Sequence, residues 1–196
     1  MMLMSGLSLL AATVPLPNAE ATPSPLPKAP PGGYLYVDEF DGPTGSAPNP
    51  ANWTVQNWQD DVWPPVAGQY RDDRQNVFLD GNSNLVIRAT QDNGDYFSGK
   101  VRGNWRVPMG HTWEARVKLD CLTSGAWPAY WAVNEDPLPD GEVDIMEFYG
   151  NLSWPPGTTV HAASNGKTWE SKSIAGLIDG AWHNWRMRWD EDGFKF

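Results

Sequence analysis

Short segments of the chain alternate between apolar and polar residues, a pattern typical of β-strands with one buried face. Residues 112–119 show this pattern most clearly, and residues 185–189 repeat it near the end of the chain. The apolar positions are Trp113, Ala115, Val117 and Leu119 in the first segment, and Trp185, Met187 and Trp189 in the second. The pattern therefore predicts two half-buried strands.

Two shorter runs, residues 34–40 and 85–90, are rich in aromatic and β-branched residues and are also predicted to form strands. Clusters of Gly, Pro, Asn and Asp separate such runs roughly every ten residues, as in a sandwich or barrel. The sequence shows no long helical periodicity and no internal repeat. We therefore expect an all-β fold, an antiparallel β-sandwich of two packed sheets.

The first 33 residues have a composition unlike the rest of the chain. Residues 1–14 are mostly small and apolar, and Ala19-Glu20-Ala21 matches an A-x-A cleavage site, although no Lys or Arg precedes the apolar stretch. We predict a signal peptide at residues 1–21 and a secreted, extracellular protein; the alternative is an apolar tail of the domain. Residues 22–33 form a Pro-rich linker, so the folded domain is expected at 34–196.

The net charge of the chain argues against several classes of binding partner. The chain has 24 Asp and Glu residues against 14 Lys and Arg residues, a formal net charge of −10. Nucleic-acid binding needs a basic surface, so this balance excludes it, and it also argues against anionic membranes and sulfated polymers. The apolar runs are too short to span a bilayer, so we expect a soluble monomer without a membrane partner. The single cysteine, Cys121, excludes an intrachain disulfide and a multi-cysteine metal site.

Tryptophan is the outlying residue type, with 12 indoles among 196 residues. A hydrophobic core does not need that many. Flat aromatic faces stack on other flat or weakly amphipathic faces, and sugar rings are one such partner. The composition therefore fits a ligand with flat or weakly amphipathic faces, of which sugar is one example.

Three carboxylates, Glu142, Asp144 and Glu147, lie within an otherwise apolar segment. On a regular strand Glu142 and Asp144 share a face, and Glu147 points the other way. One β-bulge, with Ile145 or Met146 as the extra residue, returns Glu147 to the same face. The spacing therefore predicts three acids that converge on one spot if the strand is bulged.

Acids so close together raise at least one proton affinity and titrate as a coupled set. Glycoside hydrolysis with retention needs this arrangement, because one carboxylate attacks the anomeric carbon while a neighbouring carboxylic acid protonates the leaving oxygen. The central Asp144 can share a proton with the nucleophile. The alternative interpretation is an acidic edge strand that stays hydrated and resists aggregation.

The segment 142–147 resembles the signature of glycoside hydrolase family 16, in the bulged E-x-D-x-x-E form of its laminarinase-like members. Other segments resemble further strands of the family in the same order. They are residues 97–102 (S-G-x-x-R), 125–131 (W-P-A-x-W), 158–162 and 182–185. The resemblance covers residues 34–196 and is closest to the secreted endo-β-1,3-glucanase-like group of actinobacteria.

This resemblance implies a concanavalin-like jelly roll with an open cleft and hydrolysis of a laminarin-like β-1,3-glucan. Glu142 would be the nucleophile and Glu147 the general acid and then base, with Asp144 holding the proton between them. No cofactor would be required. A structural calcium ion is frequent in the family near the N-terminal strand, but the spacing of Glu39 and Asp41 makes no calcium motif.

The resemblance also implies a set of sugar-binding residues. Trp127 and Trp131, four apart on one strand, would share a face and line the cleft, unless one packs in the core. Arg102 would bind sugar hydroxyls or, alternatively, form a surface salt bridge. Asn57 would reach the cleft from a loop. His161 would face the cleft or, equally well, be a satisfied buried histidine.

The chain ends at Phe196, where the family has several further strands. We therefore expect a truncated sandwich, with weak or no activity for residues 22–196 alone. The alternative function is a non-catalytic or inactive glycan-binding jelly roll in which the acids are vestigial. Binding alone does not need a nucleophile and an acid on one face, which favours the hydrolase.

Overall fold

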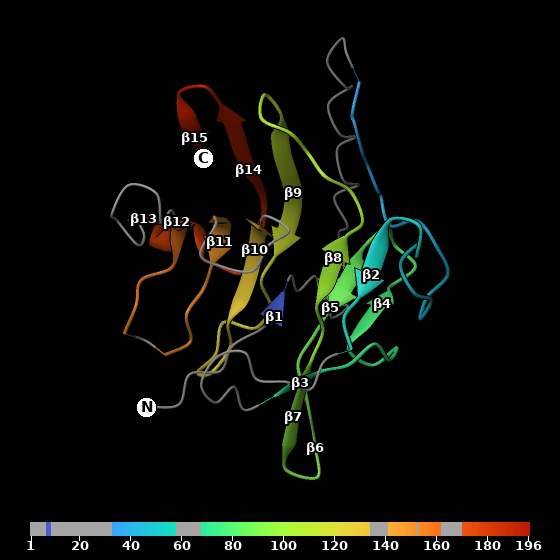
Figure 1. Ribbon diagram of the computed structural model, residues 1–196. Coiled ribbons are helices and arrows are strands. Elements are labelled where there is room, and N and C mark those ends of the chain that lie inside the picture. Colours follow the sequence, from blue (N-terminus) through green and yellow to red (C-terminus); the bar gives the residue numbers. More distant parts are fainter. Residues whose placement is uncertain (1–6, 9–32, 58–67, 134–140, 152, 162–169) are drawn as a thin grey trace.

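The computed structural model describes residues 7–8, 33–57, 68–133, 141–151, 153–161 and 170–196 (Figure 1). In these segments the 3-10 turn η2 (Ala175–Leu177) is the one helical element, and none of their helices is long and apolar enough to cross a membrane. The predicted signal peptide and linker lie outside the described residues, apart from Leu7, Ser8 and Gly33. The structure is otherwise built of strands and turns, which confirms the predicted all-β class.

The strands of the N-terminal half are short and form small ladders. They are β2 (Trp53–Val55), β3 (Gln69–Tyr70), β4 (Val77–Leu79), β5 (Leu85–Ile87), β6 (Thr90–Asp92), β7 (Asp95–Ser98) and β8 (Val101–Gly103). The pairs are β2 with β8, β4 with β5, β6 with β7, and β3 with β7. All are antiparallel except β3 with β7.

Two larger sheets form the rest of the molecule. The first has the order β1-β10-β11-β12-β13 and the second β15-β14-β9. Their strands are β1 (Leu7–Ser8), β9 (Thr112–Lys118), β10 (Pro128–Val133), β11 (Glu142–Glu147), β12 (Gly157–His161), β13 (Glu170–Ser173), β14 (Trp182–Asp190) and β15 (Gly193–Lys195). In Figure 1 the strands from β10 to β15, yellow to red, lie on the left, β2, β4, β5 and β8 lie on the right, and β3, β6 and β7 lie at the bottom between them.

The two larger sheets pack face to face around one core. In the ladder between β9 and β14 every second residue is apolar, and these residues turn to the same side. There they meet the apolar side chains of β11, and Trp185 and Met187 are only 6% and 1% exposed. The buried members of the cluster are Val117, Leu119, Val143, Ile145, Met146, Trp185 and Met187. The strands predicted from alternation are therefore confirmed, and their alternation is what buries this core.

A second, smaller cluster joins β4 and β5. Val77, Leu79, Leu85 and Ile87 are buried together there. The predicted strand 85–90 is shorter than expected, because Arg88 and Ala89 interrupt it before β6 begins.

Residues 34–40, predicted to form a strand, do not form one. Tyr36 stacks on Trp105 with a centroid distance of 3.4 Å, and Asp38 Oδ1 accepts a hydrogen bond from the backbone N–H of Phe40 at 2.8 Å. Phe40 has φ of 56°, in the left-handed region that a strand does not use. Side-chain contacts and this local turn therefore fix the segment in place of a β-ladder, and the aromatic content that suggested a strand serves as an anchor.

Candidate active site

A bulge in β11 brings the three predicted acids to one face of the five-stranded sheet. Between Asp144 and Glu147 the register with β12 shifts by one residue. On the β10 side, Asp144 and Met146 lie opposite consecutive residues, so Ile145 is the extra residue. The bulge predicted from the spacing is confirmed, and with it the shared face of Glu142, Asp144 and Glu147.

The bulge also anchors β11 in the core. Val143, Ile145 and Met146 are 8%, 1% and 0% exposed and all belong to the main hydrophobic cluster. Two consecutive residues, Ile145 and Met146, therefore face the core, which a regular strand does not allow. The apolar positions of the segment hold the strand, and the acidic ones lie on its other face.

The neighbouring strands frame the acids with small, aromatic and polar side chains. Residues directly opposite one another in an antiparallel ladder point to the same side. The acid face therefore includes Ala129, Trp131 and Val133 of β10, and Gly157, Thr159 and His161 of β12. The small residues at 129 and 157 both lie opposite Glu147, which leaves space around that carboxylate.

Asp144 and His161 form a buried hydrogen bond at the centre of the site. Nε2 of His161 lies 3.1 Å from Oδ2 of Asp144, whose side chain is 2% exposed. Burial is the main cause that raises the pKa of Asp144 to about 8, and the neighbouring carboxyls of Glu147 and Glu142 act in the same direction. The hydrogen bond to Asp144 raises the pKa of His161 in turn. Both shifts therefore favour the protonated form of each group.

The surroundings of Glu142 shift the pKa of its carboxyl in both directions. Burial raises the pKa of its carboxyl, and the charge of Glu147 adds to this. The charges of His161 and Lys100 and a hydrogen bond with Asp144 lower it. Because Asp144 is protonated near neutral pH, it can donate that hydrogen bond and stabilise Glu142 as a carboxylate.

Glu147 is held by two hydrogen-bond donors. Nε1 of Trp127 donates to Oε1 at 2.9 Å, and the hydroxyl of Tyr149 donates to Oε2 at 2.5 Å. The carboxylate is 7% exposed. Both of its oxygens are therefore fixed in position, and Trp127 lies against the acid itself and beside the ring of Tyr149, with a centroid distance of 5.6 Å.

Tyr149 is a site residue that sequence analysis missed. Its pKa is raised by burial first and then by the charge of Glu147, so it stays a neutral donor. Thr159, buried on β12, also hydrogen-bonds its hydroxyl. The signal was available, since residue 149 lies two positions after Glu147 and alternation returns it to the same face.

Lys100 is the second residue that sequence analysis missed. Its ammonium lies 4.6 Å from the centroid of the Trp131 ring, in a cation–π contact. Burial lowers the pKa of Lys100, and the charge of Glu142 opposes this. Gly99 sets this position, because a Cβ there would lie 2.6 Å from the carbonyl oxygen of Asn76. Within the family strand at 97–102, the charge of Lys100 acts on Glu142, whereas the resemblance implied a role for Arg102.

Arg102 and Asn57 are not brought to the acids by any contact within the described residues. Arg102 is exposed on β8, and its charge is felt by Lys100 two residues earlier. Asn57 is exposed where the described chain stops after β2. Of the predicted binding residues, the structure therefore groups Trp127, Trp131 and His161 with the acids, and their roles toward sugar stay predictions.

Two sets of side chains carry atoms of the kind that bind metal ions. Ligand atoms of Glu142, Asp144 and His161 lie within 4.8 Å of one another, but the hydrogen bonds of Asp144 to both neighbours already use this proximity. Glu39 and Asp41 are exposed, and among the described residues no third acidic, His or Cys ligand atom joins them. The first set is thus organised around the hydrogen bonds of Asp144.

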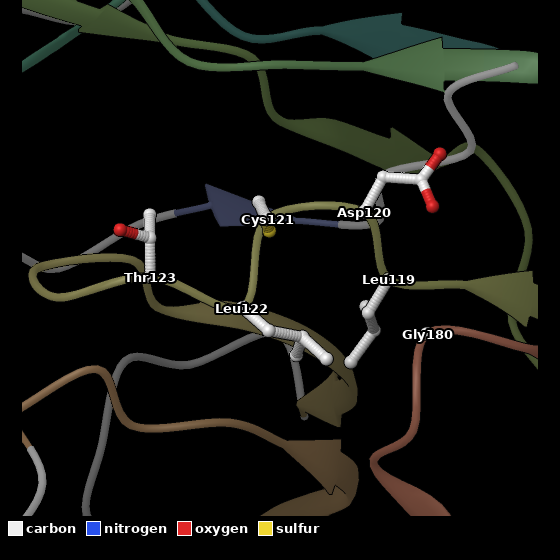
Figure 2. Close-up of a pocket in the computed structure, with 6 residues that line it drawn as sticks. All are labelled: Leu119, Asp120, Cys121, Leu122, Thr123 and Gly180. Atoms are coloured by element: carbon white, nitrogen blue, oxygen red, sulfur yellow. The ribbon is translucent and has the colours of Figure 1, made fainter. Parts of the chain in front are cut away.

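A hollow of about 380 Å³ lies elsewhere, between the end of β9 and the start of β14 (Figure 2). Figure 2 shows Leu119 and Leu122 directed to the same side of the segment, with the Asp120 carboxylate turned away from them. The remaining lining residues are Cys121, Thr123 and Gly180. This hollow contains none of the predicted site residues.

The arrangement on β11 suits acid–base chemistry with a carboxylate nucleophile. It combines an anion next to a protonated neighbour, Glu142 with Asp144, and a second carboxyl held in fixed orientation, Glu147. Double displacement at an acetal carbon needs a nucleophile and a proton donor side by side. Trp127, which donates to Glu147, and Trp131, which lies opposite Asp144, supply flat faces beside the acids.

The sequence profile described as Glycosyl hydrolases family 16 matches residues 66–196, which include all of β11. A comparison with curated proteins finds no match. Solved structures of glucanase-like proteins do match the chain over most of its length.

An immunostimulatory antigen and pseudo β-1,3-glucanase of Mycobacterium tuberculosis is 52% identical, with a TM-score of 0.77 over 83% of this chain and 70% of that one. A β-1,3-glucanase from Mycobacterium marinum is 54% identical, with a TM-score of 0.77 over 85% and 72%. An endo-1,3-β-glucanase from Streptomyces sioyaensis is 26% identical, with a TM-score of 0.66 over 82% and 70%. These matches confirm the fold expected from the sequence.

Proposed function

Because the chain belongs to glycosyl hydrolase family 16, we propose that it is a secreted endo-acting hydrolase of β-1,3-glucan that retains the configuration of the anomeric carbon. The observation that carries the proposal is the bulge in β11, which places three carboxyls on one face with Glu147 fixed by Trp127 and Tyr149. The relatives described as β-1,3-glucanases support the choice of substrate. The signal peptide predicted at residues 1–21 supports secretion.

In the first step, the Glu142 carboxylate attacks the anomeric carbon while Glu147 gives its proton to the glycosidic oxygen, so that the leaving glucan departs as an alcohol. In the second step, the Glu147 carboxylate takes a proton from water, and the water oxygen displaces Glu142 from the same carbon. Asp144 donates a hydrogen bond to Glu142 while Glu142 is anionic. The reaction consumes one water and restores every group.

A neutral polysaccharide also fits the charge of the chain. With 24 acidic and 14 basic residues, the protein repels sulfated or uronate-rich polymers at long range. Glucan carries no charge, so its binding depends on stacking and hydroxyl contacts, which Trp127 and Trp131 can provide.

A second candidate is a glycan-binding jelly roll without hydrolytic activity. One observation favours it: the relative at 52% identity is described as a pseudo β-1,3-glucanase. Under this alternative the acids would bind sugar hydroxyls. The wild-type protein would show no turnover, and substitution of Glu142 would only weaken sugar binding.

Release of reducing ends from laminarin by the full chain separates the two candidates. We expect weak but measurable hydrolysis, with a fall of roughly 10³-fold or more in Glu142→Gln and Glu147→Gln. Calorimetric titration of laminarin into Glu142→Gln should still show binding, because the variant keeps the shape of the site. Binding by the wild-type protein without any release of reducing ends would contradict the hydrolase and support the second candidate.

A further inference from the structure

Trp154 is a large apolar side chain left in solvent beside the acids. It lies in the loop between β11 and β12, and 48% of its surface is exposed. A single exposed apolar residue needs no explanation in general, but an indole is the largest such group and is seldom left this open. Two further features of Trp154 are informative: the hydrogen bonds of its loop and its contact with Tyr149.

The loop presents the indole in a fixed position. Oδ1 of Asn151 accepts hydrogen bonds from the backbone N–H groups of Ser153 and Trp154, at 3.0 and 3.2 Å. Two prolines follow, and the carbonyl of Pro156 accepts a hydrogen bond from Ile174 at 2.9 Å. Proline fixes φ and limits backbone freedom. Little conformational entropy is therefore lost when a ligand stacks on this ring.

Trp154 is also continuous with the site. Its ring meets the Tyr149 ring edge-on, with a centroid distance of 5.4 Å and an interplanar angle of 84°. The hydroxyl of Tyr149 donates to Glu147 at 2.5 Å. One aromatic ring thus separates Trp154 from the carboxyl assigned to the leaving group, and that ring follows Glu147 in the chain whereas Glu142 precedes it.

We propose that Trp154 is a stacking platform for a glucose ring on the leaving-group side of the scissile bond. This inference rests on the proposed function, because Glu147 must protonate the leaving oxygen for that side to be defined. The first leaving sugar then lies next to Glu147, within reach of the exposed ring. The C–H face of a glucose unit packs on indole without needing charge, which matches a neutral glucan.

The test combines turnover and binding in the full chain. Trp154→Ala should lower kcat/KM for laminaripentaose about tenfold, a loss of one good aromatic contact. It should leave turnover of β-laminaribiosyl fluoride unchanged, because fluoride places no sugar on the leaving side. Trp154→Phe should retain most of the activity. Leu177→Ala is the control, since Leu177 is also 48% exposed but lies in η2.

A second readout does not depend on hydrolysis. In a Glu142→Gln background, Trp154→Ala should weaken laminaripentaose binding about tenfold by calorimetry, and Leu177→Ala should not change it. Equal losses on both substrates, or unchanged binding and unchanged kcat/KM, would overturn the platform. Absence of turnover in the wild-type protein would overturn the proposed hydrolase instead, and the binding measurement would still decide whether Trp154 stacks on sugar.

Discussion

Glu142 owes its charge state to its immediate neighbours. Burial disfavours its carboxylate most, and the charge of Glu147 adds to this. His161, Asp144 and Lys100 counter these effects with two positive charges and one hydrogen bond. Under the proposed function Glu142 is the nucleophile and must be ionised to attack, so each of these three groups should affect the pH dependence of activity.

Replacement of Lys100 by Met should move the acidic limb of the kcat/KM profile to higher pH. The apolar stem against Trp131 is kept while the charge that lowers the pKa of Glu142 is lost. The loss of activity on laminarin should therefore be larger at pH 5 than at pH 8. Lys100→Arg, which keeps the charge, should retain the wild-type limb. An unchanged limb in Lys100→Met would show that Lys100 serves only to pack Trp131.

Asp144 gives the protein a pH-dependent stability. Its pKa is raised from 3.8 to about 8 on folding, so between these values the folded state binds more protons than the unfolded one. The raised pKa of His161 acts in the same direction. The free energy of unfolding should therefore fall as the pH rises from about 4 to 8, by at most about 1.4 kcal/mol per pH unit for each proton.

Asp144→Asn should flatten this dependence, because the amide does not titrate. Urea unfolding at pH 5, 6.5 and 8 would measure it for both proteins. A decline in the variant as steep as in the wild type would show that Asp144 is not the group responsible.

The bulge lets β11 pack Ile145 and Met146 in the core and still present its three acids on the other face. The three acids at spacings of two and three residues were enough to predict the bulge, since no regular strand puts them on one face. The sequence left the extra residue open between Ile145 and Met146. The ladder with β10 makes it Ile145, and both side chains are buried in the core.

Ile145→Ala and Met146→Ala should therefore each lower the free energy of unfolding by about 2–5 kcal/mol, as buried large-to-small changes do. On a regular strand one of the two would lie on the acid face and cost much less. Val133→Ala, 45% exposed on the neighbouring strand, should change stability by less than about 0.5 kcal/mol. Chemical denaturation measures all three, and a small effect at either 145 or 146 would contradict the bulge.

Strands whose apolar and polar residues alternate clearly could be predicted from the sequence. Segments that are fixed by residues distant in the sequence could not. The strands at 112–119 and 185–189 formed because their apolar positions meet the same core. Residues 34–40 have strand-like composition but are fixed by Trp105 and by a turn at Phe40. Lys100 reaches the site across a different ladder, and its role depends on the close approach at Gly99, which spacing along one strand does not reveal.

For the whole molecule, the sandwich accounts for the position of the acids. The sheet of β9, β14 and β15 covers one face of β11, so the other face remains for the carboxyls and their aromatic neighbours. The net charge of −10 disfavours anionic polymers over the whole surface. The fold therefore presents an acid face suited to an uncharged polysaccharide.

The proposed mechanism requires Glu142 to form a covalent bond to the sugar. Incubation with a dinitrophenyl 2-deoxy-2-fluoro-β-laminaribioside should trap this intermediate, because the fluorine slows both steps and the activated aryl leaving group speeds only the first. Mass spectrometry should show one added laminaribiosyl unit, located on the peptide that carries Glu142 and absent in Glu142→Gln. An adduct on another residue, or laminarin hydrolysis without any adduct on Glu142, would contradict the account.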